Sequence, residues 1–160
     1  MKTQKVCLLG RFAVGKTSLV DRYINNAFSE QYQTTVGVSI ATKIIDDLKM
    51  IIWDIAGFEH DKHYLPYLRG SHGAIWVVDS TEPDSVEVID EIIASAPQIE
   101  QVPAICLVNK MDLKNQYRLS HDHILRLEKR FGDLIYTSAK TGADVEMGFE
   151  KIKSVLQNQN

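Results

Sequence analysis

The sequence predicts a three-layer α/β domain built on a mostly parallel, doubly wound sheet of six strands. Short apolar runs rich in β-branched residues, which are typical of buried strands, alternate with longer segments of helical spacing. This alternation favours parallel pairing, because each helix returns the chain to the same end of the sheet. The expected strands cover residues 6–10, 39–45, 50–55, 74–79, 104–109 and 134–138.

The helices are indicated by apolar residues that recur along one helical face. These stripes are Val86, Ile89, Ile92 and Ile93 in the first segment, Ile124, Leu127 and Phe131 in the second, and Val145, Phe149, Ile152 and Leu156 in the third. A further helix is expected to begin near Gly15. Gly132 is expected to end the second of the three helices, and residues 141–144 (TGAD) to cap the third. Residues 46–49 are too few for a crossover helix, so the two strands that they join should pair antiparallel.

The composition is that of an ordinary globular protein. The chain, 1–160, is long enough for one domain, and its formal net charge of −3 lacks the broad excess of Lys and Arg that nucleic-acid partners require. Cys7 and Cys106 lie within apolar runs and are expected to be buried free thiols, which favours a cytoplasmic location. The apolar runs are too short for a signal peptide or a membrane span, and no lipidation motif is present. We therefore expect no intrinsic membrane anchor and no nucleic-acid partner.

Residues 10–18 (GRFAVGKTS) follow the first strand and open a helix, which is the context of a phosphate-binding loop. The backbone N–H groups of such a loop surround a β-phosphate, and the helix start adds its dipole. Lys16 would lie near the β and γ oxygens, while the Thr17 hydroxyl would hold Mg²⁺. The residues expected to contact the nucleotide here are Gly10, Val14, Gly15, Lys16, Thr17 and Ser18.

Two loops at the ends of the last two strands predict that the nucleotide carries guanine. Asp112, in residues 109–112 (NKMD), can accept hydrogen bonds from the ring N–H and the exocyclic amine of guanine, a pair that adenine lacks. The Lys110 stem can lie over the base, and the Ala139 N–H can donate to the guanine carbonyl. This argues against the alternative of an ATPase or kinase with the same phosphate loop. The expected base-binding residues are Asn109, Lys110, Asp112, Ser138, Ala139 and Lys140.

The third strand ends in residues 54–57 (DIAG), which predict a metal and γ-phosphate site. Asp54 can bind a water on Mg²⁺, and the Gly57 N–H can approach a γ-phosphate because no Cβ obstructs it. Thr35, before the second strand, supplies a second hydroxyl for the metal. The expected metal ligands are Thr17, Thr35 and Asp54.

This ordered set of motifs resembles the Ras-like small GTPases over nearly the whole chain. Tyr32, residues 35–38 and residues 53–54 are most similar to the Rab branch. The resemblance implies the P-loop NTPase fold of a Ras-like G domain and a Mg²⁺-dependent GTP/GDP switch. It also implies effector, exchange and activating proteins that recognise two switch segments. The first contains Thr35, and the second begins at residues 54–57 (DIAG) and contains Pro66.

The same resemblance implies individual roles for several residues. The implied catalytic residues are Lys16, Thr35 and Gly57. The family positions beside the nucleotide are matched by Phe28 and Tyr32. Other features depart from the Rab pattern. The turn at residues 46–49 is short, and Pro66 limits the helix that follows the second switch segment.

Phe58 stands where Ras-like GTPases usually carry the glutamine that orients the attacking water. A phenyl ring cannot do this, and Phe12 occupies a usually small position beside the path of an activating arginine. Both residues predict slow GTP hydrolysis. One alternative is a pseudo-GTPase that holds nucleotide structurally, as a scaffold or adaptor. Another is that His60 or Glu59 positions the water and the phenylalanines are merely tolerated. His60 and His63 also suggest a metal pair, but no third ligand is evident nearby.

Overall fold

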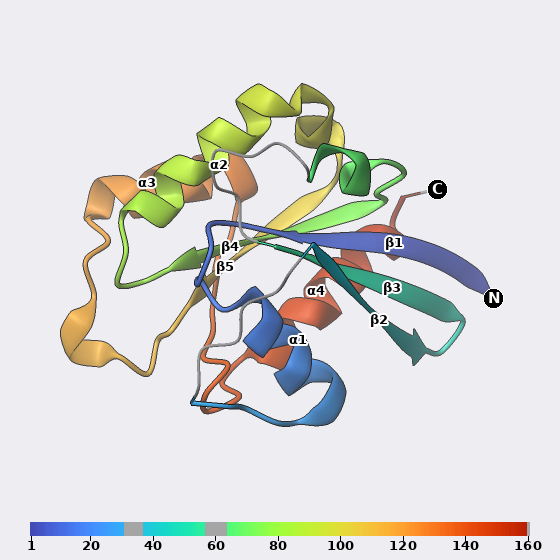
Figure 1. The fold of residues 1–160 in the computed structure, drawn as a ribbon, viewed down its shortest axis with the longest axis horizontal. Coiled ribbons are helices and arrows are strands. Elements are labelled where there is room, and N and C mark those ends of the chain that lie inside the picture. The colour runs from blue at the N-terminus through green and yellow to red at the C-terminus, as the bar shows by residue number, and fades with distance from the viewer. Residues whose placement is uncertain (31–36, 57–63, 160) are drawn as a thin grey trace.

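The computed structural model describes residues 1–30, 37–56 and 64–159 (Figure 1). The strands are β1 (Lys2–Leu9), β2 (Val38–Ile45), β3 (Leu48–Ile55), β4 (Gly73–Asp79), β5 (Ala104–Asn109) and β6 (Ile135–Tyr136). The α-helices are α1 (Lys16–Asn25), α2 (Asp84–Ser95), α3 (His121–Phe131) and α4 (Val145–Gln157). Three 3₁₀ helices in the described ranges are η1 (Leu65–Leu68), η2 (Pro97–Gln101) and η3 (Lys114–Gln116). The predicted three-layer α/β class is confirmed.

The sheet has the order β2-β3-β1-β4-β5-β6. β1 is parallel to both β3 and β4, and the pairs β4–β5 and β5–β6 are also parallel. β2 pairs antiparallel with β3, from Val38 opposite Ile55 to Ile45 opposite Leu48, so the predicted hairpin is confirmed. β3 pairs with one edge of β1 and β4 with the other, so the strand order reverses at β1. A crevice for a ligand is therefore expected at the carboxyl end of β1.

The last predicted strand, residues 134–138, is too long. Only Ile135 and Tyr136 pair with β5 as β6. Thr137 leaves the sheet after its N–H donates to Val108 O, and its carbonyl accepts from Met111 N at 3.0 Å. The chain turns away here because the next residues support the loop after β5.

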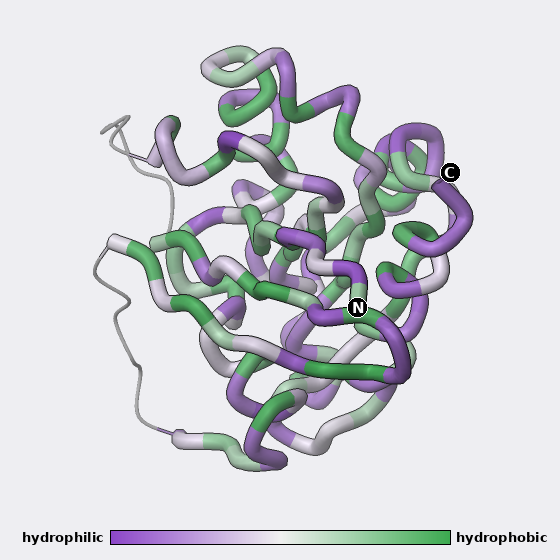
Figure 2. The backbone as a smooth tube through the Cα atoms, turned by 90° about the vertical axis from the view of Figure 1, so that its right-hand side faces the viewer, coloured by the Kyte–Doolittle hydropathy of each residue, from purple (hydrophilic) through white to green (hydrophobic). Residues whose placement is uncertain are grey.

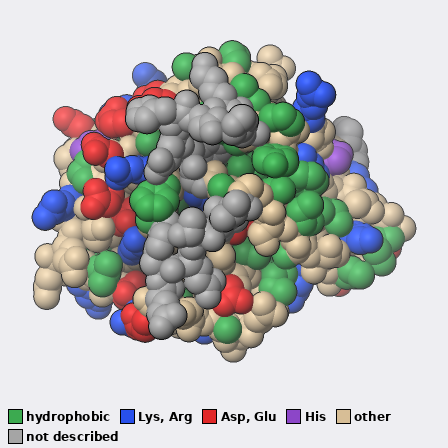
Figure 3. All heavy atoms as spheres, in the orientation of Figure 1, with side chains coloured by type: hydrophobic (Ala, Val, Ile, Leu, Met, Phe, Trp, Pro, Cys, Tyr) green, Lys and Arg blue, Asp and Glu red, His purple; other side chains and the backbone are tan. Residues whose placement is uncertain are grey.

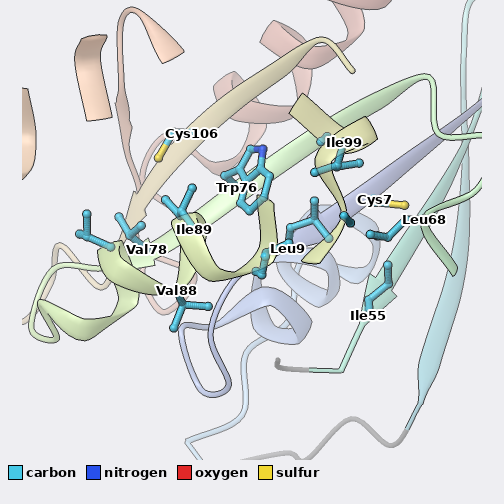
Figure 4. Close-up of a cluster of buried hydrophobic side chains, with 14 of the residues drawn as sticks. Cys7, Leu9, Ile55, Leu68, Trp76, Val78, Val88, Ile89, Ile99 and Cys106 are labelled. Carbon is cyan, nitrogen blue, oxygen red and sulfur yellow. The ribbon is translucent and has the colours of Figure 1, made fainter. Parts of the chain in front are cut away.

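Helices cover both faces of the sheet, and an apolar core lies on each face (Figure 1). On one face Trp76, Ile89 and Ile99 belong to the cluster beneath α2, α3 and η1, as the close-up in Figure 4 shows. On the other, Phe149 of α4 is fully buried and its ring stacks on Tyr23 of α1 with centroids 4.0 Å apart. Both termini lie on the side opposite the loops that follow β1, β4 and β5 (Figure 1), and Figure 2 views the molecule from the side of the termini.

The two cysteines are free and buried, as predicted. Cys106 faces the same cluster as Trp76, and Cys7 lies close to Ser71, with 3.0 Å between the thiol sulfur and the hydroxyl oxygen. Burial raises the pKa of both thiols, so each stays protonated and unreactive near neutral pH.

The predicted end of α3 is confirmed, whereas the start of α3 and the start of α4 differ from the prediction. Gly132 ends α3 as predicted, with φ 76° and its N–H donating to Glu128 O at 2.8 Å. α3 begins with an unpredicted capping box, in which Ser120 Oγ accepts from His123 N and His123 Nδ1 accepts from Ser120 N. The cap predicted for α4 is wrong, because Asp144 adopts a left-handed conformation and its side chain makes no cap bond.

Pro66 has the effect expected from the sequence. It lies at the start of η1, and the segment forms a short 3₁₀ helix of four residues, Leu65–Leu68. The η1 helix then ends at Arg69, which is extended, so the chain enters β4 without a longer helix.

The Ser120→Ala variant should destabilise the protein by about 1 kcal/mol, because the His123 N–H at the start of α3 loses its side-chain acceptor. Chemical denaturation monitored by circular dichroism would measure this. Ser154→Ala is a matched control, since Ser154 is exposed inside α4 and caps no helix. Equal stability of the Ser120→Ala protein and the wild type would contradict the capping role.

Candidate nucleotide-binding site

The predicted phosphate loop joins β1 to α1, and its two motif glycines are required by close packing. A Cβ on Gly10 would lie 2.5 Å from the Val77 carbonyl oxygen of β4. A Cβ on Gly15 would lie 2.3 Å from Asn109 Nδ2, and Gly15 also has a φ of 104°. A side chain at Gly10 would therefore displace the backbone of β4, and one at Gly15 would displace the Asn109 amide.

Lys16 lies inside the curve of this loop. Its side chain is buried, with 5% exposed, and Nζ donates to Gly10 O and Arg11 O at 3.0 Å each. Burial lowers the pKa of Lys16 to about 8, and the charge of Asp54 opposes the shift. A buried ammonium next to the first turn of a helix is a setting that favours a bound anion.

The predicted metal ligands Thr17 and Asp54 lie together. Thr17 Oγ1 donates to Asp54 Oδ2 at 2.6 Å, which joins the first turn of α1 to the end of β3. A hydroxyl and a buried carboxylate are oxygen ligands of the kind that Mg²⁺ prefers, so these two residues fit the predicted metal.

Several predicted residues lie outside the described ranges. These are Tyr32, Thr35, Gly57, Phe58, Glu59, His60 and His63. Phe12 is described: it lies in the turn of the phosphate loop, and 43% of it is exposed. Phe28 is partly buried against the core beneath α1 and α4.

Asn109 lies at the end of β5, where the loop after β5 begins. Its amide connects that loop to the phosphate loop and to the loop after β6. It is 1% exposed, and Nδ2 donates to Val14 O of the phosphate loop at 3.0 Å. Its Oδ1 accepts from Thr137 Oγ1 at 3.0 Å and from Ala139 N at 3.3 Å. The amide therefore connects the phosphate loop to the loop after β6.

Lys110 reaches back across the phosphate loop. It adopts a left-handed backbone conformation, and Nζ donates to Ala13 O at 2.8 Å. Nζ also forms an ion pair with Asp79 Oδ2 at 2.8 Å. Asp79 was missed by sequence reasoning, although a carboxylate that ends a buried apolar run was a usable signal.

The remaining predicted residues occupy the two base loops and α1. Ser138 Oγ donates to Asp112 Oδ1 at 2.8 Å, which holds the carboxylate that was predicted to read the base. Lys140 is exposed and pairs with Glu30 at 3.1 Å. Ser18 lies in the first turn of α1.

Sequence reasoning also missed Arg22 of α1. Its guanidinium donates to two carbonyl oxygens of the loop after β6, those of Ala139 and Lys140. A lone arginine inside a helix gave no signal, because its partners are more than a hundred positions further along the chain.

A phosphate-loop motif between β1 and α1, with two further loops at the neighbouring strand ends, is the arrangement of a P-loop nucleotide-binding protein.

Comparison with known proteins narrows this class. A family model described as the Ras family matches residues 5–158. Ras-related protein Rab-7b of Mus musculus is 38% identical, over 94% of this chain and 80% of that protein. Ras-related protein Rab7 of Drosophila melanogaster is 37% identical, over 96% and 80%. Ypt/Rab-type GTPase YPT7 of Saccharomyces cerevisiae is 36% identical, over 98% and 82%.

The chain belongs to the Ras family, and it is most similar to the Rab branch. It is thus a small GTPase, a switch that binds GTP and hydrolyses it to GDP. Ras-like GTPases generally use Mg²⁺ and interact with effectors, exchange factors and activating proteins. Across residues 1–30, 37–56 and 64–159, no helix has the length and apolar character needed to cross a bilayer.

Replacing Gly15 by Ala should destabilise the protein by about 2 kcal/mol or more, because a left-handed backbone cost is added to a clash with Asn109 Nδ2. It should also weaken GDP binding, measured by titration calorimetry. Gly70→Ala is a matched control, since Gly70 has a φ of 73° with nothing within 4 Å of an added Cβ, and it should cost only about 1 kcal/mol. Equal losses of unfolding free energy in the two variants would contradict the clash.

Proposed function

We propose that this small GTPase hydrolyses GTP slowly and persists in its GTP form. The observation that carries the proposal is Phe58, which follows the D-x-x-G motif where a glutamine would orient the attacking water. A phenyl ring makes no hydrogen bond of that kind. Phe12, which is half exposed on the phosphate loop, adds bulk beside the γ-phosphate position.

Each part of the site has a proposed role. Lys16 neutralises the β- and γ-phosphates, and its burial next to the start of α1 supports this. Thr17 and Asp54 hold Mg²⁺ together with Thr35, a role that the hydrogen bond between the first two supports. When bound, Mg²⁺ neutralises charge that develops on the phosphate oxygens. Thr35 and Gly57 sense the γ-phosphate.

The base is proposed to lie between the loops after β5 and β6. Asp112 accepts from the ring N–H and the amine of guanine, and its hydrogen bond from Ser138 supports a fixed carboxylate. Ala139 N–H donates to the guanine carbonyl, and the Lys110 stem lies over the ring. Asn109 joins these loops to the phosphate loop.

Effector binding is proposed on the face that carries η1 and the adjoining strands, where hydrophobic side chains gather (Figure 3). Ile40 of β2 is 52% exposed and lies opposite Trp53 of β3. The Trp53 and Tyr67 rings have centroids 6.3 Å apart, and Lys5 Nζ lies 3.7 Å from the centroid of Trp53. Along the chain, β2 follows Thr35 and η1 follows Gly57, so an effector seated on this patch would sense the bound nucleotide.

The domain organisation and the location in the cell belong to the same proposal. The whole chain, 1–160, forms one G domain, in keeping with a family match over residues 5–158. The protein works in the cytoplasm, which the two buried free thiols support.

A scaffold that holds nucleotide without using its hydrolysis is the competing function. Phe12 and Phe58 favour it as well, because a site without water positioning can serve binding alone. The two functions differ in their partners: a switch binds an effector more tightly in one nucleotide state, whereas a scaffold binds its partner equally in both.

Phe58→Gln should raise the single-turnover rate of GTP hydrolysis by at least about tenfold, equivalent to about 1.4 kcal/mol of transition-state stabilisation. The protein is loaded with GTP and Mg²⁺, and its conversion to GDP is followed over time. Phe58→Leu is the control: it changes the ring but adds no hydrogen-bonding group, and it should remain slow.

Rapid conversion by the wild-type protein would overturn the proposal and would mean that another residue positions the water. Slow conversion that Phe58→Gln leaves unchanged would show that the missing glutamine is not the limitation. Equal partner affinity in the GDP and GTP forms would favour the scaffold.

A further inference from the structure

We propose that Arg22 is a positioning residue for base recognition, which fixes the loop that presents the Ala139 N–H to the guanine carbonyl. The inference rests on the proposed roles of the loops after β5 and β6. Arg22 lies on α1, whose first turn carries Lys16 and Thr17. It thus connects the helix that follows the phosphate loop to the loop that reads the base.

The contacts of Arg22 are made by several atoms of one rigid group. Nε donates to Ala139 O at 2.8 Å, and Nη2 donates to Lys140 O at 2.5 Å. Because a guanidinium is planar, two donors on adjacent carbonyls fix the direction of that stretch of backbone as well as its distance.

The guanidinium is itself held in place. Nη1 donates to the Asn26 side-chain oxygen at 3.2 Å and to its carbonyl oxygen at 3.4 Å. Asn26 ends α1 in a left-handed conformation, and its N–H donates to Arg22 O. On the other side, an added Cβ at Gly142 would lie 3.6 Å from Arg22 Cδ, so the loop packs against the arginine stem.

Asn109 supports the same loop from the interior. Its Oδ1 accepts from Ala139 N at 3.3 Å, which is long for an N–H···O bond and is therefore a weak constraint on that N–H. Arg22 supplies the stronger constraint from the outer side. Hydrogen bonds within the loop join Ser138 to Gly142 and Ala143, and Arg22 adds the side-chain constraint on the carbonyls of Ala139 and Lys140.

The base carboxylate is held by Ser138, whose Oγ donates to Asp112 Oδ1 at 2.8 Å. Ser138 precedes Ala139 in the same loop, but its own backbone is anchored by Ala143 O at 3.1 Å and Gly142 N at 2.8 Å, without a contact from Arg22 among those described. Loss of Arg22 should therefore weaken the contact to the guanine carbonyl oxygen and spare the contact to the guanine amine. A tether that serves folding alone would affect every nucleotide equally.

The test compares three ligands in the wild type and in Arg22→Met, which keeps an apolar stem and removes the donors. GDP is the reference. 6-Thio-GDP replaces the carbonyl oxygen by sulfur, a weak acceptor, and inosine diphosphate keeps the oxygen but lacks the amine. Affinities are measured by competition against a fluorescent GDP analogue. Arg126→Met is the matched control, because Arg126 of α3 pairs with Glu87 and Asp90 away from these loops.

In Arg22→Met, GDP affinity should fall about tenfold, as expected for loss of a hydrogen-bonded support. The preference for GDP over 6-thio-GDP should fall at least threefold, while the preference for GDP over inosine diphosphate stays unchanged. Arg22→Lys keeps one donor and should give intermediate values, and it provides the same comparison if the methionine variant does not fold.

An equal loss for all three ligands would overturn the inference and leave Arg22 as a structural tether. A wild-type protein that binds ADP as tightly as GDP would instead contradict the proposed base-binding loops, and the inference with them.

Discussion

The loops of the site depend on one buried side chain, the amide of Asn109. Its Nδ2 binds the phosphate loop at Val14 O, while its Oδ1 accepts from Thr137 and Ala139 in the loop after β6. The same amide leaves no space for a side chain at Gly15. A buried amide with partners on both sides is costly to disturb, because any shift of one loop leaves polar atoms unpaired.

Three further contacts extend this unit across the sheet. Lys110 joins the end of β5 to the phosphate loop at Ala13 and to Asp79 of β4. Thr17 joins α1 to Asp54, three residues before Gly57 in the second switch segment. The contacts of Asn109, Lys110 and Thr17 all involve the phosphate loop or the first turn of α1. The residues proposed to bind base, phosphate and metal are therefore joined through that one stretch of chain.

Periodicity was enough to predict most of the fold, because the buried strands and amphipathic helices bear local patterns. It failed where tertiary contacts decide the outcome: β6 is short because Thr137 and Ser138 support Asn109 and Asp112. Motif spacing indicated the phosphate and base loops. Arg22 was missed because its partners are far away in the sequence, and Asp79 was missed although its place at the end of an apolar run was a usable signal. Asn109 was predicted to recognise guanine, and no sequence pattern indicated that its amide would connect three loops.

The most direct test is a double-mutant cycle of unfolding free energies for wild type, Gly15→Ala, Asn109→Ala and the combined variant. If the Asn109 amide is what excludes a side chain at Gly15, the alanine there should cost at least about 1 kcal/mol less once the amide is gone. Additive losses would contradict the account, because Gly15 would then be required for its backbone conformation alone and not for its close contact with the Asn109 amide.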